Sequence, residues 1–279
     1  MKNCIKKLFV SLLYVLALCF QTALTSAQTE ISIDGSTTVG PVVDAFVGAF
    51  QERHPDVSFS VKKTGSGNGI TALIEGRADI AAMSRFMTQA EYNRAVAAGK
   101  MPVTFTIALD SVCMIVHPSN PVRNMSKEQV KGMFTGEITN WRELGGPNMP
   151  IVAISRDTAS GTFEVFNQLV MDSERLGTRV EMATSNPQIF TRVSTTPGAI
   201  GYVGLGFVAD GVQAVRYEGV VPTRRSIADG TYKLSRPLYL FTDGYPEIGS
   251  ALLRFCNFFL TEEGHEIINA KGFIPLTSY

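Results

Sequence analysis

The segment PIVAISRDTASGTFEVFNQLVM, Pro150–Met171, decides the fold because it contains a strand, a turn and a helix in direct succession. PIVAIS is an apolar run of strand length, and GTFEVFNQLVM carries its apolar residues at helical spacing. Between them, RDTASGT (Arg156–Thr162) supplies the glycine and hydroxyl residues typical of turns and helix starts. A chain built from such units is expected to form a parallel sheet with helices packed on it.

The N-terminal part of the chain shows the same alternation. The segments EISID, VSFSV and DIAAMS read as strands, and GSGNGITALIEGR reads as a turn and a short helix. A further helix is predicted after GSTT, where apolar residues recur at the spacing of one buried helical face: Val39, Val42, Val43, Phe46, Val47 and Phe50. This β–α–β–α–β order predicts a second α/β unit.

The run TFTIALDSVCMIVHP, residues 104–118, is long for a strand within one lobe and is expected to cross between two lobes. After it, Ser126 and Gln129 are spaced as a capping box at a helix start. AIGYVG and RPLYLFT then read as strands and EIGSALLRFCNFFL as a helix. We therefore predict one lobe from residues 28–108 and 236–279, and another from residues 109–235.

The first 27 residues resemble a cleavable secretory signal rather than part of the fold. Three lysines precede an apolar run from Leu8 to Phe20, and the small-residue pattern TSA follows. The run is short for a bilayer, so a membrane anchor is the weaker interpretation. A third interpretation is lipid attachment at Cys19, which the bulky Leu18 before it disfavours. We expect a periplasmic protein.

Charge and cysteine content narrow the function. Without residues 1–27 the chain keeps 22 basic and 25 acidic side chains, so it offers no basic stripe for nucleic acid. Cys113 and Cys256 both lie in apolar runs, which favours two buried thiols over a disulfide framework or a metal site, although pairing between the two stays open.

Three segments place glycine and hydroxyl residues between a predicted strand and a helix start: GSTT (Gly35–Thr38), TGSGNG (Thr64–Gly69) and TASGT (Thr158–Thr162). A helix N-terminus exposes unpaired N–H groups and a partial positive charge, so an anion is stabilised there. Serine, threonine and glycine are also ordinary caps and turn residues. With three such segments in one chain, the two interpretations have about equal weight.

Arg156 favours the anion site. It follows a predicted strand, and ligands of open α/β sheets bind at the carboxyl ends of the strands. Its planar fork can donate two parallel hydrogen bonds to an oxyanion. A salt bridge to Asp157 or Glu164 is the structural alternative. Ser84 and Arg85, after another buried strand, are a fourth candidate segment.

Motifs for catalysis are missing from the sequence. It contains neither a P-loop nor H-E-x-x-H, and TASGT is not a hydrolase elbow. Only three histidines occur, in scattered contexts. We therefore expect no enzymatic activity, no cofactor and no metal. An enzyme acting on phosphate esters would need an activated nucleophile or a carboxylate cluster for metal.

Seven segments in order resemble the phosphate-binding proteins of ABC phosphate importers: IDGSTTVGPVVDAF, GSGNGI, ALDSVCMIVHPSNPV, GEITNWRELGG, RDTASGTFEVF, TPGAIGYVGL and GFIPL. The resemblance covers nearly the whole chain after residue 27. It implies a two-lobed, type II periplasmic-binding-protein fold that closes on one phosphate. It also implies a permease and an ATPase as partners, and we expect a monomer.

By matching position, the resemblance implies phosphate contacts from Thr37, the Thr38 backbone and Ser66 in one lobe. In the other lobe it implies contacts from Arg156, Ser160, Gly161 and Thr162. With the neighbouring candidates, the expected site is Ser36, Thr37, Thr38, Ser66, Ser84, Arg85, Arg156, Ser160, Gly161 and Thr162.

One position departs from the pattern of the better-known members. They carry an aspartate after the third strand, which accepts a hydrogen bond from protonated phosphate and excludes sulfate, whereas this chain has Ser84-Arg85. Asp110 is our first candidate for a replacement acceptor, and Asp34 and Asp157 are weaker ones. The alternatives to phosphate import are an exported protein for sulfate, molybdate or tungstate, and a phosphate sensor without a transporter.

Overall fold

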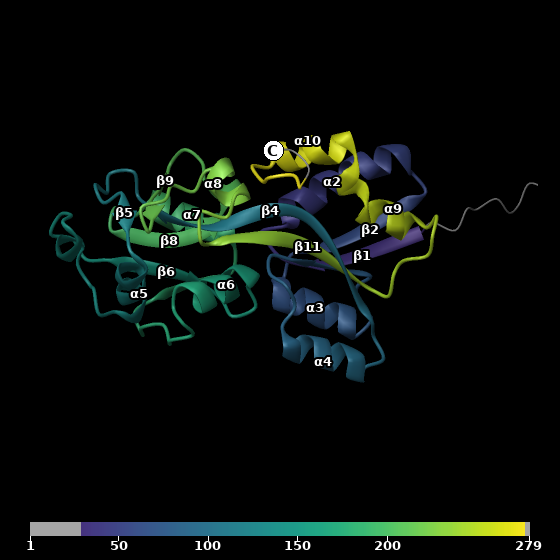
Figure 1. The fold of residues 1–279 in the computed structure, drawn as a ribbon, viewed down its shortest axis with the longest axis horizontal. Helices are drawn as coiled ribbons and strands as arrows, with labels where there is room; N and C mark the ends of the chain where they lie inside the picture. Colours follow the sequence, from purple (N-terminus) through teal and green to yellow (C-terminus); the bar gives the residue numbers. More distant parts are fainter. Residues whose placement is uncertain (1–28, 277–279) are drawn as a thin grey trace, which may run out of the picture.

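The computed structural model describes residues 29–276, which form a mixed α/β protein of two lobes sharing one sheet (Figure 1). The predicted signal sequence and the lipid-attachment site at Cys19 lie outside the described residues. Nine strands of the described part form the main sheet in the order β2-β1-β3-β11-β4-β8-β6-β7, with β9 paired to β4. The predicted two-lobed α/β architecture is confirmed.

Lobe 1 contains both ends of the described chain. Its β1 pairs in parallel with both β2 and β3, as the strand–helix alternation predicts. Helices α2, α9 and α10 pack on one face of this half-sheet, and α3 packs on the other (Figure 1). Its elements are β1 (Thr29–Gly35), α2 (Gly40–Arg53), β2 (Val57–Lys62), α3 (Ser66–Ile74), β3 (Ile80–Met83), α4 (Gln89–Ala97), α9 (Ala251–Cys256), the 3-10 turn η3 (Phe258–Leu260) and α10 (Glu262–Ala270).

Lobe 2 is built around β6, which pairs in parallel with β7 and β8. A small parallel pair, β5 with β10, lies beside the main sheet. Its elements are β5 (Asn124–Met125), α5 (Lys127–Thr135), η1 (Trp141–Leu144), β6 (Val152–Arg156), α6 (Gly161–Leu169), β7 (Glu181–Ala183), α7 (Asn186–Ser194), β8 (Ala199–Gly204), η2 (Leu205–Phe207), β9 (Gln213–Ala214), β10 (Arg216–Tyr217) and α8 (Arg224–Ala228).

Two long antiparallel strands connect the lobes. The first, β4 (Pro102–Val116), pairs with β11 (Ser235–Asp243) along its first part and with β8 along its last part. It runs across the middle of the molecule in Figure 1, so the prediction that this segment crosses between lobes is confirmed. The exact lobe boundaries, at 108/109 and 235/236, stay a prediction.

Each lobe has its own apolar core. Phe46 and Phe50 of α2 lie in the lobe 1 core, as their helical spacing predicts, with Leu238 and Leu240 of β11. The lobe 2 core holds Trp141, whose indole N–H donates to the Gly198 carbonyl at 2.9 Å. The two cores are not fully separate, because Ile274 of the C-terminal segment packs in the lobe 2 core.

One predicted helix is shorter in the structure. EIGSALLRFCNFFL was expected to be helical throughout, but α9 begins only at Ala251 and is followed by a 3-10 turn. Gly249 has φ +84°, in the left-handed region, and Ser250 accepts the capping hydrogen bond from the Leu253 N–H at 3.1 Å. These two residues fix the helix start.

Cys113 and Cys256 are free and buried, so the structure contains no disulfide between them. Burial raises the pKa of each thiol to about 12, and only the thiolate reacts. We expect neither cysteine of the protein starting at Gln28 to react with Ellman's reagent at about pH 8 while folded, and both to react in guanidinium. Rapid reaction of the folded protein, or two unreactive thiols after unfolding without reductant, would contradict this.

Candidate functional site

The three predicted turns meet where the two lobes face one another. The Thr38 and Thr162 hydroxyls, one from each lobe, share a hydrogen bond at 3.0 Å. The Gly67 N–H donates to the Ala159 carbonyl across the same gap at 3.0 Å. The starts of α2, α3 and α6 are thereby brought together.

Two of the candidate serines accept hydrogen bonds from nearby backbone N–H groups. The Ser36 hydroxyl accepts from the N–H groups of Thr38 and Val39 at 3.1 and 3.3 Å. Ser160, the N-cap of α6, accepts from the N–H groups of Thr162 and Phe163 at 3.2 and 3.3 Å. Ser160 thus caps α6 and Ser36 stabilises the turn before α2, while the phosphate contacts expected of both stay a prediction.

Gly161 allows a close approach between the lobes. A Cβ atom at this position would lie 2.4 Å from the Ser66 hydroxyl oxygen and 2.8 Å from that of Ser84. Those two serines are linked within lobe 1, because the Ser84 N–H donates to the Ser66 hydroxyl at 3.2 Å. Only glycine allows the backbone to come this close, so Gly161 brings the α6 N-terminus onto two hydroxyl groups of the other lobe.

Arg156 is 1% exposed. Its Nε and Nη2 atoms donate to the carbonyl groups of Ala183 and Thr184 at 3.2 and 2.9 Å. Its Nη1 is buried and has no hydrogen-bond partner within residues 29–276. Burial lowers the pKa of Arg156, and the nearby positive charge of Arg236 acts in the same direction. A cation that is held rigidly and left partly unpaired favours binding of an anion.

Arg236, at the start of β11, is a second buried cation that sequence reasoning missed. Its Nε and Nη2 atoms donate to the Asp110 carboxylate at 2.9 and 2.8 Å, and Nη2 also donates to the Thr162 hydroxyl at 3.0 Å. Its Nη1 is again buried without a partner in the described part of the chain. The antiparallel register of β11 with β4 places Arg236 opposite Asp110. The sequence shows only an arginine before an apolar strand.

Asn186, the first residue of α7, is the other residue that was missed. Its side-chain amide donates to Thr38 Oγ1 at 2.9 Å and more weakly to Thr37 Oγ1 at 3.4 Å. Its carbonyl oxygen accepts from the Gly204 N–H at 3.2 Å. Asn186 therefore connects the GSTT turn of lobe 1 to lobe 2. In the sequence, the surrounding segment TSNP indicates only a helix cap.

The two oxygens of Asp110 are both engaged. Oδ1 accepts from the Leu205 N–H at 2.8 Å, and Oδ2 accepts from Arg236. The structure therefore shows Asp110 as a salt-bridge partner, which was the alternative interpretation. Its role as a proton acceptor stays a prediction. The weaker candidates are also occupied: Asp34 accepts from the Thr64 hydroxyl at 2.6 Å and Asp157 from the Ala159 N–H at 3.0 Å.

Arg85, like Arg236, is already paired with a carboxylate. Its Nη1 and Nη2 atoms both donate to Glu91, each at 2.7 Å, which leaves Nε as its unpartnered donor. Burial raises the pKa of Glu91, but the hydrogen bonds from Arg85 and Thr88 outweigh burial and hold this pKa below its usual value. Arg85 reaches the cleft beside Gly67, where an added Cβ would lie 3.8 Å from its Nη2.

The charged groups at this site include the partly exposed Asp157, whose negative charge acts on Arg156. Arg156 and Arg236 lie close enough to perturb one another, and Asp110 is the fully buried carboxylate beside them. Around them stand hydroxyl groups and three helix N-termini. Such an arrangement can hold a small oxyanion that accepts many hydrogen bonds. No group of three or more histidine, cysteine, aspartate or glutamate side chains able to hold a metal lies within residues 29–276.

Comparison with known proteins agrees with this geometry. A model of the PBP superfamily domain matches residues 21–263. The chain is 30% identical to the phosphate-binding protein PstS of Bacillus subtilis, over 90% of this chain and 82% of that protein. The chain belongs to the PBP superfamily and to its PstS-like members. The predicted resemblance is confirmed, and the type II fold that it implied is confirmed with it.

Solved structures of PstS-like proteins show the same fold. A putative phosphate ABC transporter substrate-binding protein from Clostridium perfringens, solved with bound phosphate, aligns with a TM-score of 0.81 at 35% identity and covers 88% of this chain and 99% of its own. An ABC-type phosphate transport receptor from Vibrio cholerae aligns with a TM-score of 0.72 at 32% identity, with the same coverage of both chains. No helix within residues 29–276 is long and apolar enough to span a membrane.

Proposed function

We propose that this protein binds inorganic phosphate between its two lobes and delivers it to an ABC-type membrane importer. The observation that carries the proposal is the pair of buried arginines, Arg156 and Arg236, each with an Nη1 that has no hydrogen-bond partner within residues 29–276. Relatives named as phosphate-binding proteins, one of them solved with phosphate, support the choice of anion.

The number of donors suits a small anion. Micromolar binding requires about −8 kcal/mol, and one charge-assisted hydrogen bond contributes about 1.5–3 kcal/mol. Phosphate has little apolar surface to bury, so several donors must converge. In our assignment Arg156 and Arg236 supply the charge. The backbone and hydroxyl donors are Thr37, Thr38, Ser66, Ser84, Ser160, Gly161 and Thr162, with Ser36 and Asn186 in support and Arg85 contributing through Nε alone.

Phosphate would stabilise the closed arrangement because its ligands belong to both lobes. A ligand shifts a two-state equilibrium by the difference between its affinities for the two states, and a separated pair of lobes would lose half of these contacts. In this proposal residues 28–108 and 236–279 move as one body and residues 109–235 as the other. The protein is a periplasmic monomer, exported by residues 1–27, and it passes phosphate to a permease and an ATPase without a catalytic step.

Selectivity for phosphate over sulfate is the part of the proposal that departs from the pattern of the better-known members. Phosphate keeps a proton near neutral pH and sulfate does not, so discrimination requires an acceptor. Ser84-Arg85 stands where the better-known members of the family carry aspartate, and both oxygens of Asp110 already accept hydrogen bonds. A protonated phosphate would therefore donate to a hydroxyl oxygen or share Asp110. Both are weaker acceptors than a free carboxylate.

An anion panel tests the proposal on the protein starting at Gln28. Calorimetry should give one phosphate site with a micromolar or lower Kd, and weaker binding of sulfate, molybdate and tungstate. If one of those anions bound and phosphate gave neither heat nor thermal stabilisation, phosphate would be the wrong ligand and the oxyanion alternative would replace it.

A further inference from the structure

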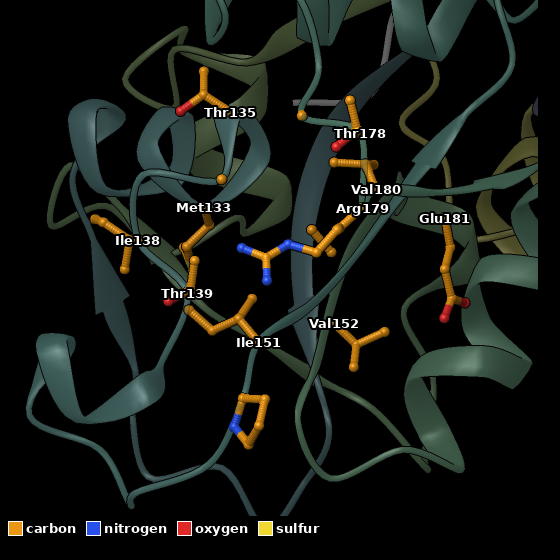
Figure 2. A pocket seen from close by; sticks show the side chains of 14 residues that line it. Met133, Thr135, Ile138, Thr139, Ile151, Val152, Thr178, Arg179, Val180 and Glu181 are labelled. Carbon is orange, nitrogen blue, oxygen red and sulfur yellow. The ribbon is translucent and has the colours of Figure 1, made fainter.

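A second concave site lies in lobe 2, away from the anion site. It is a cavity of about 440 Å³, which we call the lower slot, lined by residues of α5, the 177–181 segment and the start of β6 (Figure 2). Arg156 is the last residue of β6, whereas the slot contacts Val152, the first. The two sites therefore lie at opposite ends of one strand. The volume falls in the range of small-molecule sites, about 300–1,000 Å³.

The lower slot exists because two strands diverge. Pairing of β6 with β7 begins only at Ile154 with Glu181. Before that pair, the Gly177 N–H donates to the Phe134 carbonyl at 2.8 Å, which holds the chain against the end of α5 and away from β6. A Cβ at Gly177 would lie 2.4 Å from the Thr135 carbonyl oxygen, so glycine is required for this contact. The slot is thus a built feature of the backbone.

Half of the residues that line the lower slot have apolar side chains, and polar residues and one cation are among the rest. Apolar side chains come from Met133, Ile138, Ile151, Val152 and Val180. Figure 2 shows the Arg179 side chain extending among them toward Met133 and Ile151. Arg179 makes no hydrogen bond or ion pair with any residue in 29–276.

Glu181 is the acidic residue among those that line the slot, and it is already paired. Its two oxygens accept from Arg192, each at 2.8 Å. Thr178 adds a hydroxyl group near Arg179 (Figure 2). The slot therefore combines apolar and polar wall surface with one uncommitted guanidinium, which is complementary to a ligand with an apolar part and a single negative charge.

We propose that the lower slot binds a small monocarboxylate with an apolar tail. The planar fork of Arg179 matches a carboxylate in a bidentate arrangement, while the tail would remove apolar wall surface from water. A monoanion fits better than phosphate because Arg179 is the one cation in the lining. The site is separate from the phosphate site, so both ligands bind at the same time.

Octanoate is a suitable probe. Calorimetric titration of octanoate into the phosphate-saturated protein should show one saturable site, with weaker binding of acetate, which lacks the tail, and of octanol, which lacks the charge. Arg179→Gln should weaken octanoate binding about ten- to hundred-fold, the effect of one charge-assisted interaction, and should leave the phosphate Kd unchanged. Arg175→Gln is the matched control, because Arg175 is exposed like Arg179 and belongs to the same segment but does not line the slot.

Three results would overturn the proposal: no saturable octanoate binding, equal octanoate affinity in Arg179→Gln and Arg175→Gln, or competition between octanoate and phosphate for one site. The first two would leave the phosphate proposal intact. Loss of phosphate binding in the unmodified protein would refute the function proposed above without touching the lower slot, since octanoate can also be titrated without phosphate.

Discussion

Replacement of Arg236 by methionine should both weaken phosphate binding and destabilise the protein. Asp110 is 0% exposed and would lose its partner, and leaving one member of a buried ion pair unpaired costs about 3–5 kcal/mol. The anion would lose one charge-assisted donor, worth about 1.5–3 kcal/mol, so its Kd should rise about ten- to hundred-fold. Denaturant unfolding and phosphate calorimetry measure the two effects separately.

A second substitution separates binding from folding. In Arg236→Met with Asp110→Asn, the buried carboxylate is gone and the asparagine oxygen can still accept from the Leu205 N–H, so most of the stability should return while phosphate stays weakly bound. Arg192→Met removes an exposed arginine that also pairs with a carboxylate and should change neither quantity much. Wild-type phosphate affinity in the double variant would place Arg236 outside the anion site.

The fold was predictable because its determinants are local. Each strand, turn and helix start is encoded within a few residues, as in RDTASGT, where Ser160 caps α6 directly after β6. Even the crossing strand β4 could be recognised from its length. The helix expected at 247–260 was wrong over its first turn, where the left-handed conformation of Gly249 prevails over the apolar pattern.

The site was predictable only in part, because half of its contacts connect residues far apart in sequence. The turns themselves appear as motifs. Arg236 depends on the register between β11 and β4, and Asn186 depends on the approach of the two lobes. Both residues are far along the sequence from the residues that they contact. Arg85 shows the opposite problem, since its position was recognised but its partner, Glu91, was not.

Closure itself can be tested at Gly65, and the expected effect is large. This residue has φ +108°, and a Cβ there would lie 2.7 Å from the Ala159 carbonyl oxygen of the other lobe. Gly65→Ala should therefore oppose the closed arrangement, because overpacking against backbone costs about 1–3 kcal/mol. Phosphate affinity should fall about five- to 150-fold, and a correspondingly higher phosphate concentration should be needed to reduce the radius of gyration in small-angle scattering.

Two other glycines distinguish closure from local strain. Gly76 also has a left-handed φ, +71°, but faces no other lobe, so Gly76→Ala should lower stability without changing phosphate affinity. Gly67 faces Ala159 as well, yet a Cβ there would lie at an ordinary 3.5 Å from the carbonyl oxygen, so Gly67→Ala should bind phosphate nearly as wild type. If Gly65→Ala behaved like either control, the contact of Gly65 with Ala159 would not limit closure, and the arginines alone would have to account for the affinity.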